Sequence, residues 1–255
     1  MGHERIGSLP RSKRWRDVVA SMGEYSGSGG GGLARIARSV VHNVQERARS
    51  LPADEGVHAS FAFLVGLAVA SRSPNPTDDA PWEIKLPHEA TPIELGICLR
   101  EWVRSQGGRG EYSEIATQAA TDALAQWIQR HPSTGQEDLF ASDPDPYERW
   151  RETGSGGGFS ELAHAYFSSF TKRSLDYFLD REASAVISTV EVRERFDADV
   201  ARHADETAKI MRSYAAGWFN KHASGGPPSP KIVQRFLDYS FVKIREELLR
   251  EREAG

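Results

Sequence analysis

Apolar residues recur at intervals of three and four along most of this chain, a period that indicates amphipathic helices. The second half shows the period most clearly, in two stripes rich in aromatic side chains. The first stripe consists of Phe159, Leu162, Tyr166, Phe167, Phe170, Leu175, Phe178 and Leu179. The second stripe consists of Phe196, Val200, Ala204, Thr207, Met211, Tyr214 and Trp218. The alternation of period two that is typical of strands is nearly absent, so the pattern predicts an all-α multi-helix bundle.

One segment, residues 57–71, is apolar on nearly all sides, which is typical of a central, buried helix. Residues 74–92 hold several prolines and are expected to form a loop. A closing helix is predicted after Ser229 and Pro230, because a capping residue there precedes a proline suited to the first turn. From these patterns we expect the core to contain Phe61, Leu64, Val65, Leu67, Phe167, Phe170, Met211 and Trp218.

Two stretches of the chain echo each other. Residues 14–17 read Arg-Trp-Arg-Asp and precede a glycine run at 27–32, while residues 149–152 read Arg-Trp-Arg-Glu and precede a second run at 154–158. Glycine has no side chain to pack and loses the most backbone entropy on ordering. The echo therefore predicts two helical modules entered through flexible glycine joints, with hinges over 23–32 and 154–158.

Composition along the chain divides it into four predicted segments. Residues 1–32 are expected to be a flexible N-terminal arm with a short helix and a glycine-rich joint, and residues 33–131 a helical module. Residues 132–158 are rich in acidic residues, proline and glycine, which is typical of a linker. Residues 159–255 are expected to form a second helical module with long helices.

Charge and cysteine content narrow the class of protein. The formal net charge of -4 over 255 residues argues against binding nucleic acid by direct charge. A single cysteine, Cys98, excludes an internal disulfide framework and a multi-cysteine zinc site, and it fits a reducing cytoplasm. The longest apolar run, residues 61–70, has about half the length needed to cross a bilayer. We therefore expect a cytoplasmic protein with no membrane partner.

One basic cluster suggests catalysis. Arg35, Arg38 and His42 are spaced so that they share one face of a helix. A metal-independent ribonuclease could use such a set, with histidine as acid–base and arginine holding the scissile phosphate. The alternative interpretation is a solvated basic face with one incidental histidine, and it leaves the chain without a catalytic residue.

Anion and metal sites have weaker signals. The glycine runs could hold a phosphate at a helix N-terminus, but neither ends in the Gly-Lys-Ser/Thr of a phosphate loop. Asp199 and His203 are four residues apart, a spacing that can place two metal ligands on one helix, and Asp197 and Asp205 lie nearby. The same residues also suit the exposed side of a helix. The sequence therefore predicts no metal and no cofactor.

The order of motifs in residues 14–41 resembles that of a known protein family. They run from Arg-Trp-Arg through the glycine cluster into Leu-Ala-Arg-Ile-Ala-Arg-Ser-Val-Val, and this order resembles the B component of Qat anti-phage defence systems. The matching stretch covers about the first fifth of the chain. The resemblance implies a bacterial operon whose other products are an ATPase, an enzyme similar to those making deazaguanine, and a TatD-like nuclease. It brings no catalytic site of its own.

The resemblance also gives a role to the chain's second residue. Removal of Met1 would expose the amine of Gly2, and an enzyme that activates a carboxylate with ATP could transfer it to that amine as an amide. The resemblance thus implies that Gly2 is a modification acceptor. We expect a non-enzymatic helical accessory or adaptor protein of a multi-gene antiviral system, with the ribonuclease as the alternative.

Overall fold

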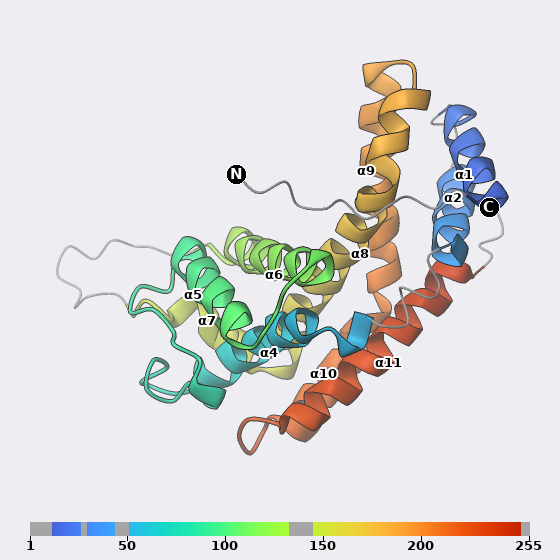
Figure 1. Cartoon of the computed structure of the whole chain (residues 1–255). Coiled ribbons are helices and arrows are strands. Elements are labelled where there is room, and N and C mark those ends of the chain that lie inside the picture. The colour runs from blue at the N-terminus through green and yellow to red at the C-terminus, as the bar shows by residue number, and fades with distance from the viewer. Residues whose placement is uncertain (1–11, 27–29, 44–50, 133–144, 251–255) are drawn as a thin grey trace.

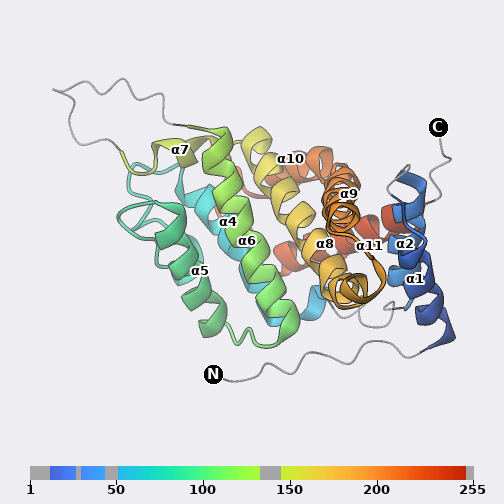
Figure 2. The same ribbon diagram turned by 90° about the horizontal axis from the view of Figure 1, so that it is seen from above.

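The protein is described by a computed structural model covering residues 12–26, 30–43, 51–132 and 145–250. Within these ranges all regular secondary structure is helical, so the predicted all-α fold is confirmed. The elements in chain order are α1 (Lys13–Gly23), α2 (Gly30–Asn43), η1 (Leu51–Ala53), α4 (Glu55–Ala70), η2 (Pro81–Glu83), α5 (Pro92–Ser105), α6 (Glu111–Arg130), α7 (Glu148–Arg151), η3 (Glu152–Gly154), α8 (Gly156–Val186), α9 (Val190–Ala208), α10 (Ile210–His222) and α11 (Pro230–Leu249). Figure 2 shows α5 at one end of the molecule, α4, α6, α8 and α9 across its middle, and α1 and α2 at the other end.

Helix α4 lies at the centre because its sequence is apolar on every side. It packs against α5, α6, α8 and α11. Asp54 caps its N-terminus by accepting hydrogen bonds from the backbone N–H groups of Gly56 and Val57. The ring of Phe61 lies in an aromatic cluster with Phe159, Tyr166, Phe167 and Phe236. All of the side chains that the sequence placed in the core are buried.

Buried side chains form two apolar clusters. The larger, which we call the body cluster, joins α4, α5, α6, α10, α11 and the first half of α8. The smaller, the hairpin cluster, joins α1, α2, the second half of α8 and the start of α9. Helix α8 is 31 residues long and contributes to both clusters. Figure 1 shows the hairpin of α1 and α2 beside the upper part of α8 and α9, away from α4 to α6.

The packing brings together segments that the sequence assigned to different modules. Helices from residues 33–131 and from residues 159–255 share the body cluster. Within the predicted linker, residues 145–158 form α7, η3 and the start of α8, and Trp150 there is fully buried. Residues 1–11 and 133–144 lie outside the described residues, as do residues 27–29 of the first glycine run, whereas residues 30–32 form the start of α2.

The second glycine run has a packing role. A Cβ atom at Gly158 would lie 2.0 Å from the backbone oxygen of Glu152, and one at Gly156 would lie 2.4 Å from Oδ1 of Asn220. These glycines therefore allow close contact between η3, α8 and α10, whereas the sequence had suggested only flexibility. The hinge itself stays a prediction.

The predicted start of the last helix is confirmed. Ser229 occupies the N-cap position of α11 and Pro230 its first helical position. Among the described residues, no helix combines the length and the apolar content needed to span a membrane.

Candidate functional site

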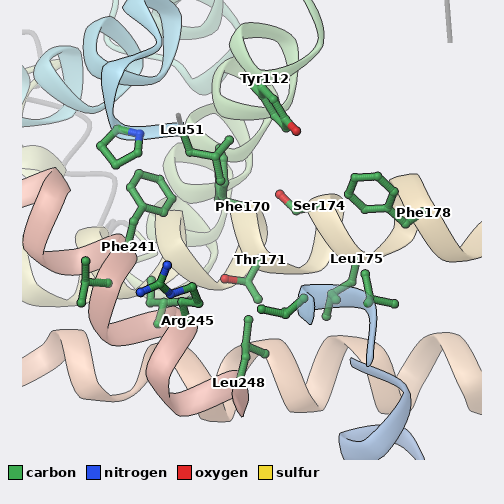
Figure 3. A pocket seen from close by; sticks show the side chains of 15 residues that line it. Leu51, Tyr112, Phe170, Thr171, Ser174, Leu175, Phe178, Phe241, Arg245 and Leu248 are labelled. Carbon is green, nitrogen blue, oxygen red and sulfur yellow. The ribbon is translucent and has the colours of Figure 1, made fainter. Parts of the chain in front are cut away.

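A half-open apolar pocket of about 180 Å³ lies where the body cluster meets the hairpin cluster. We call it the seam pocket. Its wall is formed by Val40, Val41, Leu51, Pro52, Tyr112, Phe170, Thr171, Ser174, Leu175, Phe178, Phe241, Val242, Ile244, Arg245 and Leu248. Figure 3 shows these side chains converging from α8, α11, α2, η1 and the start of α6.

The pocket results from three helices that meet at different angles. Helix α8 runs past the junction and supplies side chains one or more turns apart, among them Phe170, Ser174 and Phe178. Helix α2 contacts α8 and α11 here, and the C-terminal half of α11 supplies Phe241 and Leu248. Each helix presents an apolar stripe, and where the three stripes diverge the space between them is not filled by the described side chains.

Two polar side chains in the wall have no partner among the described residues. The Oγ atom of Ser174 is buried and accepts or donates no hydrogen bond there. Arg245 is half-buried and makes no hydrogen bond or ion pair within the described ranges. Two residues earlier on α11, Lys243 does have a counter-ion, since its Nζ contacts Oε2 of Glu246 at 2.8 Å. A buried hydroxyl without a partner and a half-buried cation without a counter-ion both cost free energy, which a bound polar group would recover.

Apolar side chains beside the pocket are also exposed to solvent. On α11, Val242 is 41% exposed and lines the pocket, and Tyr239, 43% exposed, lies one turn before it. The ring of Tyr239 packs on Tyr214 of α10 with centroids 4.3 Å apart. An apolar pocket with an exposed apolar rim is typical of a surface that binds a partner.

The residues proposed for catalysis lie on α2. Arg35 and His42 are exposed, while Arg38 is half-buried and donates a hydrogen bond to the backbone oxygen of Arg250 at 3.3 Å. Arg38 therefore links α2 to the end of α11. Gly2, the proposed acceptor, lies outside the described residues.

The acidic residues considered for metal binding have other neighbours. Asp199 is buried and accepts hydrogen bonds from the hydroxyl of Tyr25 and the guanidinium of Arg202. Burial and the hydrogen bond to Asp199 raise the pKa of Tyr25 to about 12. Within the described residues, no group of three or more His, Cys, Asp and Glu side chains could hold a metal ion. Asp199 thus serves to hold α1–α2 against α9.

A buried polar contact that the sequence did not single out joins α8 to α9 and α10. His164 is fully buried, and its Nε2 lies 3.2 Å from the backbone oxygen of Asp205 and 3.4 Å from its carboxylate. Nδ1 of His164 lies 3.5 Å from a guanidinium nitrogen of Arg212. Burial lowers the pKa of His164 in spite of the nearby carboxylate.

Sequence reasoning missed both polar residues of the seam pocket. Arg245 opens a run of alternating charges near the end of the chain, and Ser174 is one polar residue within an apolar stripe. One signal was present: Arg245 follows Ile244 and precedes Leu248 by three, so it borders the apolar face of α11. Which side chains would face it across the junction could not be read from the local pattern.

No protein-family model, curated protein or solved structure matches this chain.

Proposed function

We propose that this protein is a non-enzymatic helical adaptor of a multi-gene anti-phage defence system and that the seam pocket, with Tyr239 and Val242 on its rim, binds a partner protein. The observation that carries the adaptor role is the half-open apolar pocket beside exposed apolar side chains. Burying such a surface against a partner removes apolar area from water, which is the main source of affinity in most protein associations.

The link to defence systems comes from the resemblance of residues 14–41. These residues include α1 and most of α2, and Val40 and Val41 near the end of that stretch line the seam pocket. The proposed partners are accordingly the products of the same operon: the ATPase, the deazaguanine-synthase-like enzyme and the TatD-like nuclease. Gly2 is proposed as the site at which the second of these modifies the chain.

The adaptor role is tested by placing a charge on the rim. In Val242→Asp, the new carboxylate would be desolvated on docking and would compete for Arg245, three residues later on the same helix, so we expect co-purification with the co-expressed operon products and phage protection to fall at least about tenfold. Ile93→Asp is the matched control, because Ile93 is 77% exposed on α5, away from the pocket. Equal partner binding by Val242→Asp and wild type would contradict the docking site.

A second comparison separates the adaptor from the ribonuclease. His42→Ala is expected to leave protection unchanged, whereas loss of a catalytic acid–base would lower a cleavage rate on the order of a hundredfold or more. Mass spectrometry of the N-terminal peptide after co-expression tests the acceptor, with an adduct expected on Gly2. A folded His42→Ala protein without any activity would favour the ribonuclease instead.

A further inference from the structure

The size of the seam pocket limits what it can hold. Its volume of about 180 Å³ is slightly larger than that of an apolar cavity of about 150 Å³ that binds benzene. One phenyl ring, or a leucine-sized side chain, therefore fills it. The lining around that space is mainly aliphatic and aromatic, with Phe170, Leu175 and Leu248 among its members.

Ser174 and Arg245, which have no partner within the described part of the chain, add chemical selectivity. Figure 3 shows Ser174 on one side of the pocket and Arg245 on another, beneath Phe241. A guanidinium binds a carboxylate through paired N–H donors, and these charge-assisted bonds are stronger than neutral ones. The Ser174 hydroxyl can donate to a neutral acceptor such as a peptide carbonyl. The occupant that satisfies all three features has an apolar side chain of this size, a carbonyl and a carboxylate close together.

We infer that the seam pocket binds the C-terminal residue of a partner chain, when that residue is phenylalanine or leucine. Arg245 and the apolar side chains line one small pocket. The carboxylate that pairs with Arg245 must therefore lie within a few bonds of the ligand's apolar side chain. In an extended peptide the side chains of neighbouring residues point to opposite faces, which disfavours an adjacent Asp or Glu. The carboxylate of the terminal residue itself meets the requirement. The inference rests on the proposed adaptor role and names the part of the partner that docks.

The test uses two probes that differ only in charge. N-acetyl-L-phenylalanine carries the ring, the carbonyl and the carboxylate, while N-acetyl-L-phenylalaninamide replaces the carboxylate with a neutral amide. Each is titrated into the full-length protein and followed by heteronuclear NMR. We expect the acid to bind in the millimolar range, with shifts in residues 170–178 and 241–248, and the amide to bind at least about tenfold more weakly.

Variants of the protein assign the selectivity to Arg245. Arg245→Met keeps an unbranched apolar stem and removes the charge, so the acid should then bind no better than the amide. Arg245→Lys should restore part of the preference. Arg235→Met is the matched control, because Arg235 is exposed on the same helix and lies outside the pocket wall, and it should behave as wild type. Ser174→Leu fills the pocket and should abolish binding of both probes in a protein whose thermal unfolding is unchanged or higher.

Equal affinity for acid and amide, an unchanged preference in Arg245→Met, or no shifts with either probe would each overturn the inference. These outcomes are distinct from failure of the adaptor role. If Val242→Asp loses the partner while the probes show no preference, the pocket docks a partner by other chemistry. If the probes behave as expected while Val242→Asp keeps its partner, the pocket binds a terminal carboxylate but does not serve the proposed docking.

Discussion

The two Arg-Trp-Arg stretches, which look alike in sequence, occupy different surroundings. Trp15 of α1 lies in the hairpin cluster, edge-on to Phe178, and its Nε1 donates to Oε1 of Glu182 at 3.4 Å. Trp150 of α7 lies in the body cluster, and its Nε1 donates to the backbone oxygen of Ala90 at 2.9 Å. Both tryptophans are buried anchors, yet one secures a two-helix hairpin and the other secures the centre of the molecule.

The glycines that follow these two stretches differ more strongly in how closely they are packed. A Cβ atom at Gly158 would overlap the backbone oxygen of Glu152, whereas one at Gly32 in α2 would lie 3.9 Å from the nearest atom, in the ring of Tyr25. One glycine is required by close packing and the other is not. A repeated sequence pattern therefore does not imply a repeated structural role, because the neighbours across the fold decide what each glycine does.

The largest expected effect separates the two tryptophans. Trp150→Ala leaves a cavity in the body cluster and should lower the free energy of unfolding of the whole protein by about 3–5 kcal/mol. Trp15→Ala should open the hairpin of α1 and α2 locally. Thermal unfolding with hydrogen exchange distinguishes them, since protection of α4 and α6 should persist in Trp15→Ala. Equal loss of protection in α4 for both variants would contradict the difference.

A smaller effect separates the two glycines. Gly158→Ala forces the backbone of η3 away from α8 and should cost about 1–3 kcal/mol or more. Gly32→Ala should be neutral or stabilise by up to about 1 kcal/mol, because alanine favours helix and meets no close atom. Denaturant unfolding measures both.

The hinge prediction is checked alongside this comparison. If residues 154–158 act as a hinge, limited proteolysis should cut there before it cuts within residues 159–219. Strong hydrogen-exchange protection of residues 156–158 would favour a purely packed segment.

One titratable residue in each half of α8 should make the stability of the fold depend on pH, and the two dependences should have opposite signs. His164, in the half that belongs to the body, has a lowered pKa, so the unfolded chain binds a proton that the folded chain does not. Stability should therefore fall as pH drops below about 6.5, the ordinary pKa of histidine. His164→Gln should reduce this dependence in thermal unfolding measured from pH 7.5 to 5.

The smallest effect comes from the half that carries the hairpin. Burial and the carboxylates of Asp176 and Asp197 raise the pKa of Asp180 to about 6. The folded state thus holds a proton that the unfolded state has released, and stability should fall as pH rises from about 4 to 6. Asp180→Asn should stabilise the protein at pH 7 by less than about 1 kcal/mol, because solvent screens this exposed group. The variant and wild type should converge below about pH 4.

Sequence reasoning reached further for the fold than for the site. The apolar surface around residues 57–71 predicted a central helix, and the capping pair at Ser229 and Pro230 predicted where α11 begins. Both predictions rest on residues that are close together in the sequence. The seam pocket has no comparable signal, because Val40, Ser174 and Arg245 are far apart in the chain and each looks ordinary among its own neighbours.

The sequence by itself determined the helical class and the buried side chains, since a helix period and a cap depend on residues only three or four positions apart. The tertiary structure alone decided that α8 joins both clusters, that Gly158 must lack a side chain, and that Arg245 lines an apolar pocket with no counter-ion among the described residues. These features depend on which distant surfaces pack together. That choice is made by the free energy of burying many side chains at once, which no local pattern contains.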